Sequence, residues 1–211
     1  MRRLPVYLLI DTSGSMRGEP IQAVNVGLQT MISSLRSDPH ALDSVYLSII
    51  TFDKIVSEIF PLTELSAVQL PEIQTPDAGP TFLGEALRMV CENYDREVVM
   101  STSEAKGDWM PLLFIMTDGK PSDLAVFKEY VPKIKAKKFA NIIGCAAGPK
   151  AKEEFLKEIT DNVVSLDTTD ATAFQQFFKW VSASVSVGNQ SMGATDELVL
   201  PPPPPEVNLV I

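Results

Sequence analysis

The chain is poor in the side chains from which soft-metal and disulfide-rich sites are built. It contains one histidine, His40, and two cysteines, Cys91 and Cys145, among 211 residues. A zinc site with several histidines is therefore excluded, and few routes to histidine acid–base chemistry remain. Two cysteines are too few for a disulfide scaffold, and they suit a reducing compartment.

Long apolar runs and basic surface are also scarce. After Met1-Arg2-Arg3, the apolar run over residues 6–10 ends at Asp11. A signal peptide needs roughly 7–15 apolar residues, and a membrane helix roughly 18, so we expect neither from this run. With 18 basic and 27 acidic side chains the net charge is −9, and the pI is near 4.7. A nucleic-acid binder or an anionic-membrane binder needs a basic face, so we expect neither partner, and the default expectation is a soluble cytoplasmic protein.

What the chain does contain is a regular alternation of short apolar runs and amphipathic stretches. Strands are expected at residues 6–10, 45–52, 55–60, 111–116, 141–147 and 163–166, and helices at 20–35, 83–94, 124–134, around 155–159 and at 174–185. The short connection Asp53-Lys54 makes the third strand an antiparallel partner of the second. This pattern predicts one α/β domain with a doubly wound, mostly parallel six-stranded sheet and helices on both faces.

The C-terminal part has a different composition. We expect the folded domain to cover residues 1–187 and residues 188–211 to form a proline-rich tail, with five consecutive prolines at 201–205. The prolines favour an extended polyproline helix, a spacer or a docking ligand. Val207, Leu209 and Ile211 could add a strand to a sheet edge, in this molecule or on a partner, or the segment could be a disordered terminus.

Oxygen-bearing side chains follow two of the expected strands. Asp11 comes directly after the first strand, with Ser13 and Ser15 at positions +2 and +4, and Asp118 follows the central strand. In an extended turn these three side chains of the first motif would point to the same side. Thr81 adds a hydroxyl just before a helix. Ligands of open α/β sheets bind beyond the carboxyl ends of the strands, so these five residues are the candidate site.

The chemistry of these donors indicates a hard cation. Carboxylates and hydroxyls without nitrogen or sulfur suit Mg²⁺, and Mn²⁺ or Ca²⁺ could take the same oxygens. Two carboxylates and three hydroxyls do not fully satisfy a dication that takes about six oxygens. The ion would keep water or accept an Asp or Glu carboxylate from a protein partner.

Asp11-Thr12-Ser13-Gly14-Ser15, together with Thr81 and Met116-Thr117-Asp118-Gly119, resembles the metal-ion-dependent adhesion site (MIDAS) of von Willebrand factor A domains. The resemblance spans roughly residues 4–187. It implies a Rossmann-like fold with one antiparallel edge strand. It also implies that Ser13, Ser15 and Thr81 offer hydroxyls to the ion and that Asp11 and Asp118 act directly or through water.

The stretch Phe114 to Asp123 and the compact length are similar to the bacterial tellurite-resistance TerY group. That likeness implies a cytoplasmic domain in a chemical-stress system, with kinase and phosphatase partners. The leading hypothesis is therefore a non-catalytic, Mg²⁺-dependent protein-interaction module.

Other interpretations of the same residues stay open. Asp11 could be the nucleophile of a Mg²⁺-dependent phosphotransferase or phosphatase of haloacid-dehalogenase type, although such enzymes usually carry a second Asp where Ser13 stands. The chain could also be a scaffold whose polyproline tail recruits partners. Thr81 could cap the helix that follows it, and Asp123 is expected to cap the helix that begins after it.

Overall fold

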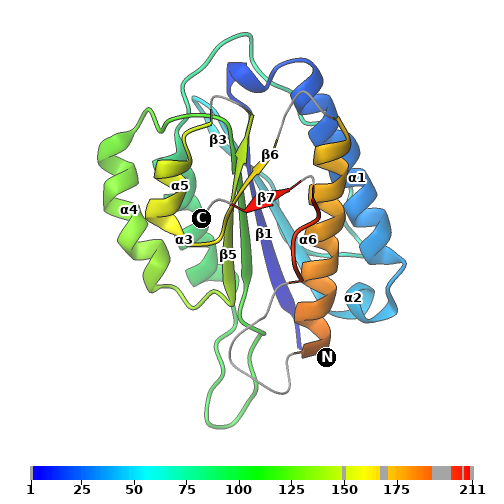
Figure 1. Ribbon diagram of the computed structural model, residues 1–211. Coiled ribbons are helices and arrows are strands. Elements are labelled where there is room, and N and C mark those ends of the chain that lie inside the picture. Colours follow the sequence, from blue (N-terminus) through cyan, green and yellow to red (C-terminus); the bar gives the residue numbers. More distant parts are fainter. Residues whose placement is uncertain (1, 149–150, 167–170, 192–200, 206, 210–211) are drawn as a thin grey trace.

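The core of the molecule is one twisted sheet with helices on both faces (Figure 1). The computed structural model describes residues 2–148, 151–166, 171–191, 201–205 and 207–209. The strands are β1 (Leu4–Asp11), β2 (Val45–Phe52), β3 (Val56–Glu64), β4 (Leu112–Thr117), β5 (Asn141–Ala147), β6 (Val163–Leu166) and β7 (Asn208–Leu209). The helices are α1 (Glu19–Arg36), α2 (Pro39–Ser44), α3 (Leu83–Glu97), α4 (Leu124–Ala136), α5 (Glu153–Ile159) and α6 (Ala171–Ser191), with one 3₁₀ turn, η1 (Gly14–Met16).

The strand order is β3-β2-β1-β4-β5-β6-β7. Strands β1, β2, β4, β5 and β6 run parallel, and β3 lies antiparallel at one edge, so the six predicted strands and their doubly wound order are confirmed; β7 is a seventh strand beside β6. The chain builds outward from β1 to β2 and β3, then returns through α3 to place β4 on the other side of β1. The strand order therefore reverses between β1 and β4, and this switch point is where such sheets bind ligands.

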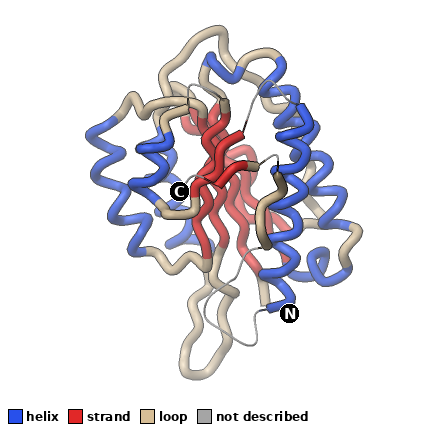
Figure 2. The backbone as a smooth tube through the Cα atoms, viewed as in Figure 1, coloured by secondary structure: helices blue, strands red, loops and turns tan. Residues whose placement is uncertain are grey.

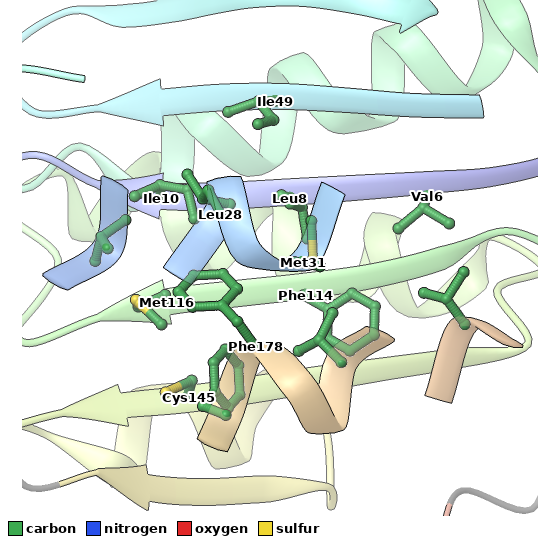
Figure 3. Close-up of a cluster of buried hydrophobic side chains, with 14 of the residues drawn as sticks. Val6, Leu8, Ile10, Leu28, Met31, Ile49, Phe114, Met116, Cys145 and Phe178 are labelled. Atoms are coloured by element: carbon green, nitrogen blue, oxygen red, sulfur yellow. The ribbon is translucent and has the colours of Figure 1, made fainter. Parts of the chain in front are cut away.

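Two apolar layers bury the two faces of the sheet. Helices α1, α2 and α6 cover one face, and α3, α4 and α5 cover the other (Figures 1 and 2). Along β1, Val6, Leu8 and Ile10 point into the first layer, while Tyr7 and Leu9 point into the second. Figure 3 shows the first layer, where Phe178 of α6 lies beside Leu28 and Met31 of α1 over β1 and β4. A strand buried on both sides needs an apolar residue at nearly every position, as β1 has from Leu4 to Ile10.

The predicted hairpin is longer than the sequence indicated. Strand β3 continues through Pro61 to Glu64, whereas an irregular segment was expected from Pro61 onward. A proline is tolerated there because β3 is an edge strand, whose outward N–H groups have no strand partner. The short helix α2 was not predicted either; Asp38 caps it by accepting hydrogen bonds from the amides of His40 and Ala41, at 3.0 and 3.4 Å.

The described part of the tail lies against the domain. Helix α6 runs to Ser191, four residues beyond the expected boundary at 187. Strand β7 pairs antiparallel with β6, Val207 is 2% exposed, and Trp180 of α6 donates its indole N–H to the carbonyl of Pro201 at 2.8 Å. The tail therefore adds a two-residue seventh strand in cis, and Ile211 lies outside the described residues. Within the described ranges, no helix has the length and apolar character needed to cross a membrane.

Candidate metal centre

Three separated segments meet at the switch point between β1 and β4. They are the turn after β1, the residues before α3 and the loop after β4. All five candidate residues lie on them: Asp11, Ser13 and Ser15 on the first, Thr81 on the second and Asp118 on the third.

Asp11 is the most deeply buried member, with 0% of its surface exposed. Its Oδ1 accepts a hydrogen bond from the Ser13 amide at 2.8 Å, and its Oδ2 accepts one from Thr117 Oγ1 at 2.5 Å. These two bonds fix the carboxylate from the turn after β1 and from the end of β4. Thr117 was quoted in the sequence motif only as the residue before Asp118, and its role in holding Asp11 follows from the pairing of β1 with β4.

The two serine hydroxyls link Asp11's turn to Asp118. Ser13 Oγ lies 3.2 Å from Ser15 Oγ, and Ser15 Oγ donates to Asp118 Oδ1 at 2.9 Å. The convergence of these side chains is confirmed, but the expected reason is wrong. The turn is not extended, because Gly14–Met16 form a 3₁₀ turn that brings position 15 back toward position 13.

Thr81 is brought beside the loop after β4. Its amide donates to Ser122 Oγ at 3.0 Å, and the Ser122 amide donates to the Thr81 carbonyl at 2.8 Å. A Cβ added to Gly119 would lie 3.0 Å from Thr81 Oγ1, so this hydroxyl faces the residue next to Asp118. The glycine at 119 leaves the approach to that hydroxyl open.

Asp123 was expected to cap α4, the helix that begins after it, but it caps α3 instead. The Asp123 carboxylate makes no cap bond to α4 but accepts hydrogen bonds from the amides of Gly84 and Glu85, at 3.1 and 2.7 Å. It therefore caps α3, the helix that Thr81 was a candidate to cap. Asp123 thus fills the capping role for which Thr81 was a candidate, which leaves the Thr81 hydroxyl available to a ligand.

The electrostatics of the site favour binding of a cation. Burial raises the pKa of Asp11 to about 6, an effect that the hydrogen bonds from Thr117 and Ser13 oppose and the charge of Asp118 reinforces. Burial also raises the pKa of Asp118, against the hydrogen bond from Ser15. Within the described part of the chain, neither carboxylate has a lysine or arginine as an ion-pair partner. Two adjacent, partly desolvated carboxylates without a countercharge favour binding of a positive ion.

The donors at this site define which ion fits. The described residues include no group of three or more His, Cys, Asp and Glu side chains that could hold a metal. A cation here would rely on two carboxylates, on neutral hydroxyls and on oxygens from outside the protein. That set suits Mg²⁺ or another hard cation and not a soft one.

Comparison with known proteins identifies a matching domain family and similar folds. Residues 6–180 match the family model of the von Willebrand factor type A domain. A search of curated protein sequences returned no match.

Among solved structures, a von Willebrand factor type A protein from Catenulispora acidiphila has a TM-score of 0.68 at 15% identity, over 88% of this chain and 43% of its own. Proximal thread matrix protein 1 from the mussel byssus, in a form with a zinc-occupied MIDAS motif, has a TM-score of 0.62 at 18% identity, over 88% and 48%. The manganese-loaded TRAP protein of Plasmodium vivax has a TM-score of 0.56 at 22% identity, over 84% and 73%. The chain thus spans less than half the length of the first two, and these likenesses concern the fold.

Proposed function

Because the chain belongs to the von Willebrand factor type A domain family, we propose that it is a non-catalytic, metal-dependent protein-interaction module. The observation that carries this proposal is the pair Asp11 and Asp118, joined through serine hydroxyls at the switch point; within the described ranges no lysine or arginine forms an ion pair with either. The relatives whose titles name zinc in a MIDAS motif and bound manganese support it.

The five candidate residues would hold the ion together. Ser13, Ser15 and Thr81 would offer hydroxyl oxygens, and Asp11 and Asp118 would act directly or through water. Mg²⁺ is the ion that we propose. When bound, a divalent cation neutralises the buried carboxylates and leaves coordination positions for outside oxygens.

An Asp or Glu of a protein partner is the proposed outside donor. The chain as a whole carries a charge of −9 and repels an acidic partner at long range. Two exposed lysines lie in the segments that form the site: Lys54 follows β2, and Lys120 lies two residues after Asp118. The bound ion and these lysines would favour a carboxylate at short range.

The cellular setting is a second part of the proposal. From the likeness of Phe114 to Asp123 to the TerY group, we propose that the chain acts in a cytoplasmic tellurite or chemical-stress resistance system, with a kinase and a phosphatase as partners. The two buried cysteines suit a reducing compartment. Cys91 packs in the layer under α3 and Cys145 in the layer on the other face of the sheet, so the two thiols cannot form an intramolecular disulfide.

The phosphotransferase alternative receives little support from the geometry. A nucleophilic Asp11 would have to reach a phosphorus atom, yet it is 0% exposed and both of its oxygens accept hydrogen bonds. Lys120, the lysine nearest to Asp118 in sequence, would be the candidate catalytic lysine, but its Nζ lies 5.9 Å from the centre of the Phe155 ring. With Mg²⁺ present, we expect no turnover of an aryl phosphate.

Titration with Mn²⁺, followed by electron paramagnetic resonance of the free ion, tests the metal site. We expect one ion per wild-type chain, displaced by excess Mg²⁺, and binding at least about tenfold weaker in Asp118→Asn. Asp43→Asn, an exposed carboxylate on α2, is the matched control and should bind as wild type does. Equal Mn²⁺ binding by Asp118→Asn and the wild type would show that the site is elsewhere.

A further inference from the structure

We propose that Ile55, in the turn between β2 and β3, is a specificity residue of the partner-binding face. It would contact an apolar side chain that lies within two residues of the partner's acidic residue. This inference rests on the proposed function and names the class of partner: a segment in which an Asp or Glu stands next to a large aliphatic or aromatic residue.

The turn that carries Ile55 is fixed against the candidate metal centre. Asp53 Oδ2 accepts a hydrogen bond from Thr12 Oγ1 at 3.2 Å, and the Asp53 carbonyl accepts one from the Phe82 amide at 3.0 Å. Thr12 precedes Ser13, and Phe82 follows Thr81, so the turn is bonded to both segments that flank the site. Strands β1 and β2 are parallel and in register from Leu4 to Asp11, which places the ends of both strands at the same edge of the sheet.

Ile55 itself is held in place within this turn. Its amide donates to Asp53 Oδ1 at 2.8 Å, and its carbonyl accepts from the Asp53 amide at 3.2 Å. The backbone is therefore ordered before any partner arrives. A turn whose backbone is already ordered loses little backbone conformational entropy when a partner binds.

The exposure of Ile55 is unusual for its position. Its side chain is 67% exposed, although connections between antiparallel strands favour Asn, Asp and Gly. The described residues include three other exposed large hydrophobic side chains, and each lies elsewhere: Val26 in α1, and Val99 and Met100 in the segment between α3 and β4. Ile55 is thus the exposed apolar group at the metal edge of the sheet.

The neighbours of Ile55 define the partner chemistry further. Lys54 is exposed beside it and adds positive charge on the same turn. A carboxylate at the ion and an apolar side chain over Ile55 satisfy both features of this surface at once. An uncharged polar segment would leave the carboxylate position empty, and a wholly apolar one would leave Lys54 without a partner.

Selection from a displayed library of random heptapeptides tests the proposal on the full chain, in Mg²⁺ and in EDTA. Wild type, Ile55→Ser and Val26→Ser are compared; Val26 is the matched exposed aliphatic residue away from the site. For wild type and Val26→Ser we expect Mg²⁺-dependent peptides with Asp or Glu and with Leu, Ile, Val or Phe within two residues of it. For Ile55→Ser the acidic residue should persist and the apolar neighbour should be lost.

The selected wild-type peptide should bind Ile55→Ser about tenfold more weakly, with unchanged Mn²⁺ affinity and melting temperature. Acidic peptides without an apolar preference, or an apolar preference that survives in Ile55→Ser, would overturn this inference alone. If Mg²⁺ enriches no acidic peptide on the wild type, the proposed function fails and the inference fails with it.

Discussion

Replacing Asp11 with Asn should stabilise the metal-free protein and abolish its response to divalent ions. Asn keeps the shape of the side chain and still offers Oδ1 to the Ser13 amide. It removes the charge that burial makes costly. The variant thus separates the requirements of the ion from those of folding.

The magnitude follows from the pKa of Asp11, which rises from 3.8 to about 6 in the folded protein. This shift of about 2 pK units corresponds to a cost of about 3 kcal/mol for keeping Asp11 ionised. Asn also puts an amide nitrogen, which cannot accept, where Asp11 Oδ2 accepts the hydrogen bond from Thr117, and losing that bond costs about 1 kcal/mol. The net gain in the free energy of unfolding is about 2 kcal/mol, or about 5 °C in melting temperature for a chain of this size.

The pH dependence of this gain has a definite sign. Because folding raises the pKa of Asp11, the stability that this group contributes is fully present below about pH 3.8. It is lost as the pH rises through about 6. The difference between Asp11→Asn and wild type should therefore be near its full size at pH 8 and largely gone at pH 4.

Differential scanning calorimetry in EDTA, from pH 4 to pH 8, measures this difference. Added Mg²⁺ should then raise the melting temperature of wild type but not of Asp11→Asn, with Asp43→Asn behaving as wild type. An Asp11→Asn protein that is less stable than wild type in EDTA at pH 8 would refute the burial argument. One that still responds to Mg²⁺ would refute the site.

Two further predictions concern packing. Gly27→Ala should lower the free energy of unfolding, measured by calorimetry, by about 1–3 kcal/mol, because the new Cβ would lie 2.1 Å from Phe178 Cδ2 where α1 meets α6. Adding Phe178→Leu to this variant should restore part of the loss. An unchanged stability of Gly27→Ala would contradict this close approach. Val207→Asp should detach the C-terminal segment, since it buries an unpaired charge in a site that is 2% exposed. We expect a loss of about 1–2 kcal/mol and a red shift of Trp180 emission in a Trp109→Phe background, whereas an unshifted emission would show that the segment does not cover Trp180.

The secondary structure could be predicted wherever local pattern and burial agree. The run Val6 to Ile10 is apolar at every position because β1 is buried on both faces, and the spacing of Ile21, Val24 and Leu28 in α1 follows one buried helix face. The end of β3 was missed because Pro61 argues against a strand except at a sheet edge, and the edge position depends on the rest of the sheet.

The sequence by itself determined the kind of site. The scarcity of histidine and cysteine, and the motif from Asp11 to Ser15, left oxygen as the available donor, and the alternation of strands and helices placed Asp11 and Asp118 at strand ends. These properties are local, because they depend on residue type and on spacing along the chain.

Only the tertiary structure decided how the site is held and what surrounds it. Thr117 bonds to Asp11 across 106 positions, Asp123 caps α3 across 38 and 39, and the turn of Ile55 is bonded to Thr12 and Phe82. A hydroxyl or carboxylate oxygen accepts a hydrogen bond from whichever donor the fold brings near it. The residues next to it in sequence do not predict which donor that is. These contacts therefore depend on strand order and helix packing, which the chain settles as a whole.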